Sequence, residues 1–213
     1  MAEFPTTDEE QVEAIKKWWS ENGLYLIAGV LLGLGGLFGW NYWQNLKSER
    51  AMQGSETYTQ LQRAVQSQDL AKAQELTGIL GDRYAATPYD ETGYLVEASL
   101  YSRQGDLAGA ERSLRKAIES AKIPEVKDVA RLRLVTVLNA SGQFQQALDL
   151  VSESFPAAYT SLIEEYKGDA LLGLGDEQGA AEAYDRALLS TNGRAEYLQW
   201  KRNDLGSRSK GAS

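Results

Sequence analysis

The sequence predicts an all-α protein: a single N-terminal transmembrane helix, then an α-solenoid of about four helical hairpins and a C-terminal capping helix. Two observations predict this architecture. One is an uncharged apolar run at residues 24–43, and the other is a short pattern that recurs four times between residues 68 and 180. No stretch shows the apolar–polar alternation of a β-strand. We therefore expect a membrane anchor and a repeat domain in one chain.

The apolar run has the length and flanks of a membrane span. Leu24 to Trp43 contains twenty residues without a charge, and a helix of that length rises about 30 Å, the thickness of a bilayer's hydrocarbon core. Aromatic residues that favour membrane interfaces stand at both ends of the run: Trp18, Trp19, Trp40, Tyr42 and Trp43. A cleaved signal peptide would leave an apolar stub, and a buried core helix would not need aromatic residues at both ends.

Residues 1–23 form the segment before the span, which we expect to be a tail with a short interfacial helix. Val12, Ile15 and Trp19 would share one face of that helix, and the chain would turn towards the membrane near Asn22 and Gly23. A frayed tail is the alternative. Basic residues lie on both sides of the span, so the charge count leaves the topology undecided.

Glycines within the span predict contact with another helix. Gly29 and Gly33, and likewise Gly35 and Gly39, are four residues apart, the small-residue spacing that lets two helices approach closely. The partner would be a second copy of the chain or another membrane protein. Glycine is also common in membrane helices, so a simple compositional origin is the alternative.

A repeated pattern follows the span. Four short segments each hold a turn residue and, five positions later, one of the alanines Ala73, Ala110, Ala147 and Ala180, which are 37, 37 and 33 residues apart. Glycine permits the tight turn, the acidic or amide residue after it can cap the next helix, and the alanine lets the two helices approach. The segments therefore predict stacked helical hairpins rather than a non-repetitive bundle.

The repeats set the remaining boundaries. We expect the repeat domain to cover residues 44–205, with a last helix over 194–205 that places Leu198 and Leu205 on one face and covers the open end of the solenoid. Residues 206–213 are expected to be a flexible tail. Because residues 41–66 contain no proline, the membrane helix is predicted to continue directly into the first solenoid helix.

Aligned on their alanines, the segments resemble the tetratricopeptide repeat. The alignment places Tyr101 and Leu138 at the family's large position in the first helix of a hairpin, and Gly168 at its small position. Departures occur in two repeats: the first has Gln68 in place of the turn glycine and Thr77 in place of a large residue, and the third has Ser154 in place of a late alanine.

The resemblance implies a binding surface on the first helices of the hairpins. The family's inward positions fall on Tyr58, Gln62, Leu95, Ser99, Arg103, Leu132, Thr136, Asn139, Glu165, Asp169 and Leu172. This set mixes apolar, amide and charged side chains, which suits an extended or helical polypeptide better than a terminal carboxylate. Packing or plain solvent exposure is the alternative for any one of them.

The whole order of elements is also similar to one bacterial family, the YfgM-type ancillary SecYEG translocon subunits. The similarity is most specific at residues 7–19 and 198–205. It implies a single-pass protein of the bacterial inner membrane, with a cytoplasmic N-terminus and a periplasmic repeat domain. It also implies two partners, the SecYEG translocon and a membrane-anchored periplasmic prolyl-isomerase-like chaperone.

The composition excludes most catalytic chemistry. The 213 residues include neither cysteine nor histidine, so the chain has no thiol nucleophile, no disulfide and no imidazole for acid–base catalysis or zinc. With 22 basic and 30 acidic residues the net charge is −8, which disfavours nucleic acid as a partner. We expect no enzyme activity, cofactor or metal; catalysis by carboxylates alone is the remote alternative.

Two functions fit these observations. The first is a module anchored to the lipid bilayer that binds unfolded or newly translocated polypeptides and helps to pass them from the translocon to envelope chaperones. The alternative is a scaffold that self-associates through the span and assembles an envelope or membrane complex.

Overall fold

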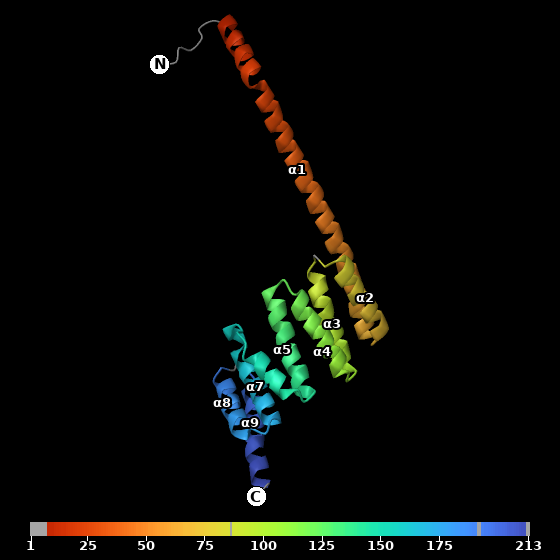
Figure 1. Ribbon diagram of the computed structural model, residues 1–213, viewed down its shortest axis with the longest axis vertical. Coiled ribbons are helices and arrows are strands. Elements are labelled where there is room, and N and C mark those ends of the chain that lie inside the picture. The colour runs from red at the N-terminus through yellow and green to blue at the C-terminus, as the bar shows by residue number, and fades with distance from the viewer. Residues whose placement is uncertain (1–7, 86, 191–192, 212–213) are drawn as a thin grey trace, which may run out of the picture. The chain divides into compact units, whose positions relative to one another are not determined.

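The structure is a computed structural model that describes residues 8–85, 87–190 and 193–211. These residues form α-helices and one 3₁₀ turn, with no strand among them (Figure 1). The all-α prediction is therefore confirmed. The chain divides into two compact units between Met52 and Gln53, and each is considered by itself below.

The first unit consists of the N-terminal part of α1, which runs from Asp8 to Gln66. Among the described residues α1 is the one helix that is long and apolar enough to cross a membrane. The turn expected near Asn22 and Gly23 is absent. The Asn22 side chain donates a hydrogen bond to the Trp18 carbonyl (3.1 Å), one turn back in the same helix. Asn22 therefore does not begin a new helix.

The second unit begins with the last part of α1 and stacks helical hairpins. The helices that follow α1 along the chain are α2 (Leu70–Arg83), α3 (Pro88–Arg103), α4 (Leu107–Ser120), α5 (Pro124–Ala140), α6 (Phe144–Val151), α7 (Thr160–Gly173), α8 (Glu177–Leu189) and α9 (Ala195–Gly211). The hairpins pair α1 with α2, α3 with α4, α5 with α6 and α7 with α8. The repeat prediction therefore holds for all four segments.

The hairpin turns use one backbone conformation four times. Gly105, Gly142 and Gly175 have φ angles of 78°, 75° and 85°, and Gln68 occupies the corresponding place at 58°. Only glycine adopts this left-handed region without steric cost. The first repeat, which has Gln68 in place of glycine, thus makes the same turn as the other three. Asp69, Asp106 and Asp176 then cap the following helices, as expected, whereas the Gln143 side chain does not cap α6.

The alanines of the repeat lie where the paired helices touch. Ala73, Ala110, Ala147 and Ala180 are all completely buried. Large side chains one turn further along the second helices, such as Leu114 and Tyr184, are almost fully buried and fill the space between neighbouring helices. The largest cluster of buried apolar residues in the described part of the chain joins α3, α4, α5, α6 and α7.

The third repeat departs from the others because its second helix is short. α6 has 8 residues, against 14 in α2 and α4, and the chain then passes through the 3₁₀ turn η1 (Ala157–Tyr159). Ser154 therefore lies beyond the helix that a late alanine would have packed. Arg131 holds the segment in place: its guanidinium donates to Glu153 (2.7 Å) and to the Ser154 carbonyl (3.1 Å) and covers the Phe155 ring.

The last helix covers the end of the stack, as predicted. Leu198 and Leu205 are buried, and Leu205 packs with Ala180 and Tyr184 of α8. The expected tail at 206–213 needs correction, since α9 continues to Gly211; residues 212–213 lie outside the described part. A single glycine inside a helical segment is tolerated at a modest cost, and no proline stops the helix at 206.

The turn at Gln68 makes a testable prediction. Gln68→Gly should raise the free energy of unfolding by about 1 kcal/mol, because glycine removes the steric cost of the positive φ angle. Gln60→Gly is the matched control, since Gln60 is exposed and lies in the interior of helix α1, where glycine should destabilise by a similar amount. Urea unfolding of the full chain in mild detergent, followed by circular dichroism, measures both. A loss of stability in both variants would contradict the strained turn.

Candidate polypeptide-binding surface

The first helices of the hairpins lie side by side in the second unit. α3 contacts α5, and α5 contacts α7. Side chains that point away from the second helices therefore form a common inner surface across α3, α5 and α7. The predicted site residues lie on this set of helices and on the last part of α1.

The structure separates the eleven predicted residues by exposure. Gln62, Arg103 and Thr136 are exposed, and Ser99 and Asn139 are half-buried. Leu95, Leu132 and Glu165 are buried instead, at 7%, 7% and 2% exposure. The remaining three, Tyr58, Asp169 and Leu172, are half-buried and each packs or bonds within the domain.

Ser99 and Thr136 meet at one cavity between α3 and α5. It has a volume of about 280 Å³ and is lined by Ala98, Ser99, Ser102, Leu114, Arg133, Thr136 and Val137. Aliphatic groups form much of the lining, and hydroxyl groups with one guanidinium form the rest. Sequence reasoning missed Ser102 and Arg133, because the family's inward positions do not include them; a helical projection of α5 with Thr136 at its centre would have found Arg133 three residues away.

The hydroxyl groups of this cavity present acceptors. The hydroxyls of Ser99, Ser102 and Thr136 each donate to a carbonyl of their own helix, at 2.7, 3.0 and 3.2 Å. Their lone pairs therefore remain available to a ligand N–H. Small aliphatic groups together with such acceptors suit a polypeptide backbone with a small apolar side chain.

The fourth repeat presents no open surface at Glu165 and Asp169, because α9 binds these side chains. Lys201 donates to Glu165 (2.9 Å) and to both Asp169 oxygens (2.8 Å), and Arg194 pairs with Glu165 at 2.9 Å. The Tyr184 hydroxyl donates to Asp169 at 2.7 Å. Burial lowers the pKa of Lys201, but its hydrogen bonds to the two carboxylates raise the pKa by more, so the ammonium stays charged.

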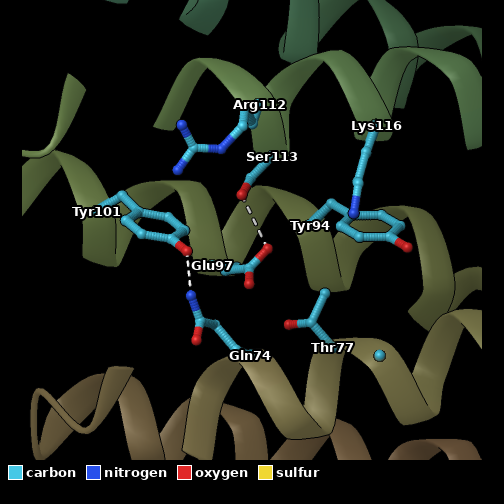
Figure 2. Close-up of a pocket in the computed structure, with 9 residues that line it drawn as sticks. Gln74, Thr77, Tyr94, Glu97, Tyr101, Arg112, Ser113 and Lys116 are labelled. Atoms are coloured by element: carbon cyan, nitrogen blue, oxygen red, sulfur yellow. Dashed lines mark hydrogen bonds between the residues drawn. The ribbon is translucent and has the colours of Figure 1, made fainter. Parts of the chain in front are cut away.

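A second cavity, which was not predicted, lies between α2, α3 and α4 (Figure 2). Its volume is also about 280 Å³, and its lining is polar: Gln74, Thr77, Gly78, Tyr94, Glu97, Tyr101, Arg112, Ser113 and Lys116. Figure 2 shows the Glu97 carboxylate in the middle of this group, where it accepts from the Ser113 hydroxyl at 2.8 Å. The Thr77 hydroxyl is buried and has no hydrogen-bond partner among the described residues.

Glu97 is an ionisable group in an unfavourable place. Burial raises the pKa of Glu97 above its ordinary value, although the Ser113 hydrogen bond and the charges of Lys116 and Arg112 oppose that shift. A buried carboxylate of this kind lowers the free energy of unfolding at neutral pH, where it is charged. The cavity beside it is lined mostly by polar residues and lies within the stack of helices.

The predicted glycine positions of the span are open. A Cβ atom at Gly29, Gly33, Gly35 or Gly39 would meet nothing within 4 Å. Gly29 and Gly33 share one side of α1, and Gly35 and Gly39 share another, since residues four apart are neighbours on a helix. Contact with a partner helix at these glycines stays a prediction.

Known proteins with similar sequences support one family. Residues 16–207 match the family model of the tetratricopeptide repeat-like domain. Relatives named ancillary SecYEG translocon subunit occur in Haemophilus influenzae (28% identity over 88% of this chain and 91% of the relative) and in Escherichia coli strain K12 (29% over 95% and 98%). A third, from Aggregatibacter actinomycetemcomitans, is 29% identical over 86% and 90%. The resemblance inferred from the sequence is thus confirmed. No solved structure matches the chain.

The contact between α7 and α9 predicts an unequal effect of two neighbouring substitutions. Lys201→Met should lower the free energy of unfolding by about 3 kcal/mol, because it leaves the buried Glu165 and the half-buried Asp169 without their shared ammonium partner. Arg202→Met is the matched control: its partner Asp185 is exposed, so the loss should stay under about 1 kcal/mol. Urea unfolding measures both, and equal losses would contradict the buried cluster.

Glu97 predicts a pH-dependent gain in stability. Its folded-state pKa is raised, so its contribution to stability is fully present below its ordinary pKa and is lost as pH rises through the folded value. Glu97→Gln should therefore unfold less readily than the parent at pH 7, with the advantage vanishing near pH 4.

Glu111 provides a control of opposite sign for that experiment. A hydrogen bond from Gln143 and the pairing with Arg115 lower the pKa of Glu111. Glu111→Gln should therefore be less stable than the parent at pH 7, and the deficit should shrink as pH falls through the folded pKa. Unfolding free energies measured from about pH 2 to 8 compare the two variants, and deficits of the same sign in both would refute the assignment for Glu97.

Proposed function

This chain belongs to the tetratricopeptide repeat-like domain family, and on that premise we propose that it is a membrane-anchored adaptor of a bacterial Sec translocon. The observation that carries the proposal is the name shared by three relatives, ancillary SecYEG translocon subunit, over nearly the full length of both chains. The apolar helix α1 supports a membrane anchor, and the repeat domain supports a role in binding other proteins.

We place the chain in the bacterial inner membrane as a single-pass protein, with the N-terminus in the cytoplasm and the repeats in the periplasm. Supporting this placement are the one membrane-length helix among the described residues and the relatives' association with the translocon. On this side of the membrane the repeats would meet polypeptides as they emerge.

The ligands we propose for the inner surface are unfolded or newly translocated polypeptides. The cavity between α3 and α5 supports this choice, since it combines aliphatic groups with hydroxyl acceptors for backbone N–H groups. The adaptor would then pass these polypeptides to a membrane-anchored, prolyl-isomerase-like chaperone. Binding and release are all that this role requires of the chain, so we propose no catalytic activity for it.

Self-association through the span is the second candidate. The glycine pairs at Gly29 and Gly33 and at Gly35 and Gly39 favour it, because their backbone is open to a second helix. In this case the chain would be a scaffold for an envelope or membrane complex. The same glycines would also serve close packing against a translocon helix, so the identity of the partner at the span separates the two functions.

In-cell photo-crosslinking tests the proposal. A photoreactive residue at Leu37 reports on the span, and one at Thr136 reports on the inner surface, where Thr136 is exposed. Leu132 is too buried to serve as a probe. Mass spectrometry of the products should find translocon subunits at Leu37 and envelope polypeptides at Thr136.

Gln145 on α6 is the control position, since it is exposed and lies on the second helix of its hairpin. Crosslinking of the same polypeptides from Gln145 would refute a binding surface on the first helices. Only self-crosslinks at Leu37, with no products at Thr136, would overturn the adaptor and favour the scaffold.

A further inference from the structure

One face of α1 carries two tryptophans followed by two cations where the apolar run ends. Trp40, Trp43, Lys47 and Arg50 are three, four and three residues apart, so they lie along one side of the helix. We call these four residues the Trp–Arg stripe. The indole rings are exposed, with Trp40 at 59% and Trp43 at 46%, and their centroids are 5.4 Å apart. The Lys47 ammonium lies 3.7 Å from the centroid of the Trp43 ring.

No carboxylate shares this face of the helix. Successive residues of a helix point about 100° apart, which places Glu49 on the side of α1 that faces away from the stripe. Neither Lys47 nor Arg50 forms an ion pair with any residue that the structure describes. At the other end of the span, Lys17 has Glu13 and Glu21 four residues away on either side, so its charge is already accompanied. The two ends of the span therefore differ in the carboxylates that lie near their cations along the helix.

The depth of the stripe matches the headgroup layer of a bilayer. Counted from Trp43, the last residue of the uncharged run, Lys47 lies about 6 Å and Arg50 about 10 Å further along the axis. The polar layer outside the hydrocarbon core is about 5–8 Å thick on each side. The indoles are thus at the boundary with the acyl chains, and Lys47 is within the polar layer. Arg50 starts just outside that layer, and its long side chain, which points back toward the N-terminus of the helix, can reach the level of the phosphates.

We propose that the Trp–Arg stripe binds the phosphate of an anionic phospholipid. Lys47 and Arg50 would donate to the phosphate oxygens, and the indoles would pack against the glycerol and upper acyl region. The order of groups along the stripe, aromatic and then cationic, follows the order of groups along one lipid molecule, which favours a lipid over a protein partner. The inference rests on the proposed membrane placement of α1.

Native mass spectrometry of the full chain in detergent tests the site, with equimolar phosphatidylglycerol and phosphatidylcholine of the same acyl chains as probes. Each membrane-proximal cation contributes about fivefold to the binding of an anionic lipid. We therefore expect the parent to retain phosphatidylglycerol in roughly twenty-five-fold preference, and the double variant Lys47→Gln, Arg50→Gln to bind the two lipids almost equally.

The double variant Lys16→Gln, Lys17→Gln is the matched control, since it removes the same charge at the other end and should keep most of the preference. Absence of preference in the parent, or equal loss in both double variants, would overturn the site. The site would also be overturned if the Lys47→Gln, Arg50→Gln variant kept its lipid preference but no longer co-purified with translocon subunits. That result would make the stripe a contact with protein. Extraction of the parent from membranes by carbonate would instead overturn the anchor itself, an outcome seen without any lipid measurement.

Discussion

The repeat domain depends on the close approach of two helices within each hairpin. Two helices can approach only if the residues between them are small, and the four alanines at this contact have no exposed surface. A larger side chain there would push the helices apart at a cost of about 1–3 kcal/mol. The left-handed turn residue two positions before each second helix begins serves the same close packing, because it reverses the chain within a few residues.

This constraint explains which parts of the fold could be predicted from the sequence. The small residues and turn residues recur at fixed spacings in the sequence, so the four hairpins were predictable. The capping role of α9 was predictable as well. The turn at Gln68 keeps the left-handed conformation although it has no glycine. The buried alanine contact and the Asp69 cap next to it hold the turn in place. The continuous helix through Asn22 and Gly23 was not predictable, because both residues permit a turn as readily as a helix.

The candidate binding surface followed from the sequence less well than the fold, since its residues were assigned from the family's inward positions and not from contacts in the structure. Ser99 and Thr136 do line a cavity, but Glu165 and Asp169 are bound by α9. The sequence separates Glu165 from Lys201 by 36 residues, and no local pattern links them. The polar cavity at Glu97 is likewise formed by three helices, none of which carries a recognisable signal by itself.

The extent of the open surface bears on how an adaptor of this kind would bind. Because α9 pairs with the inner side chains of α7, the open stretch centres on α3 and α5, which have 16 and 17 residues. Helices of that length measure about 25 Å, enough for about eight residues of extended chain. So short a contact favours weak and rapidly exchanging binding. A membrane anchor compensates for weak binding, because it holds the surface at high effective concentration near other membrane proteins. Weak contact combined with tethering is the arrangement that allows a polypeptide to be captured and then released to the next protein.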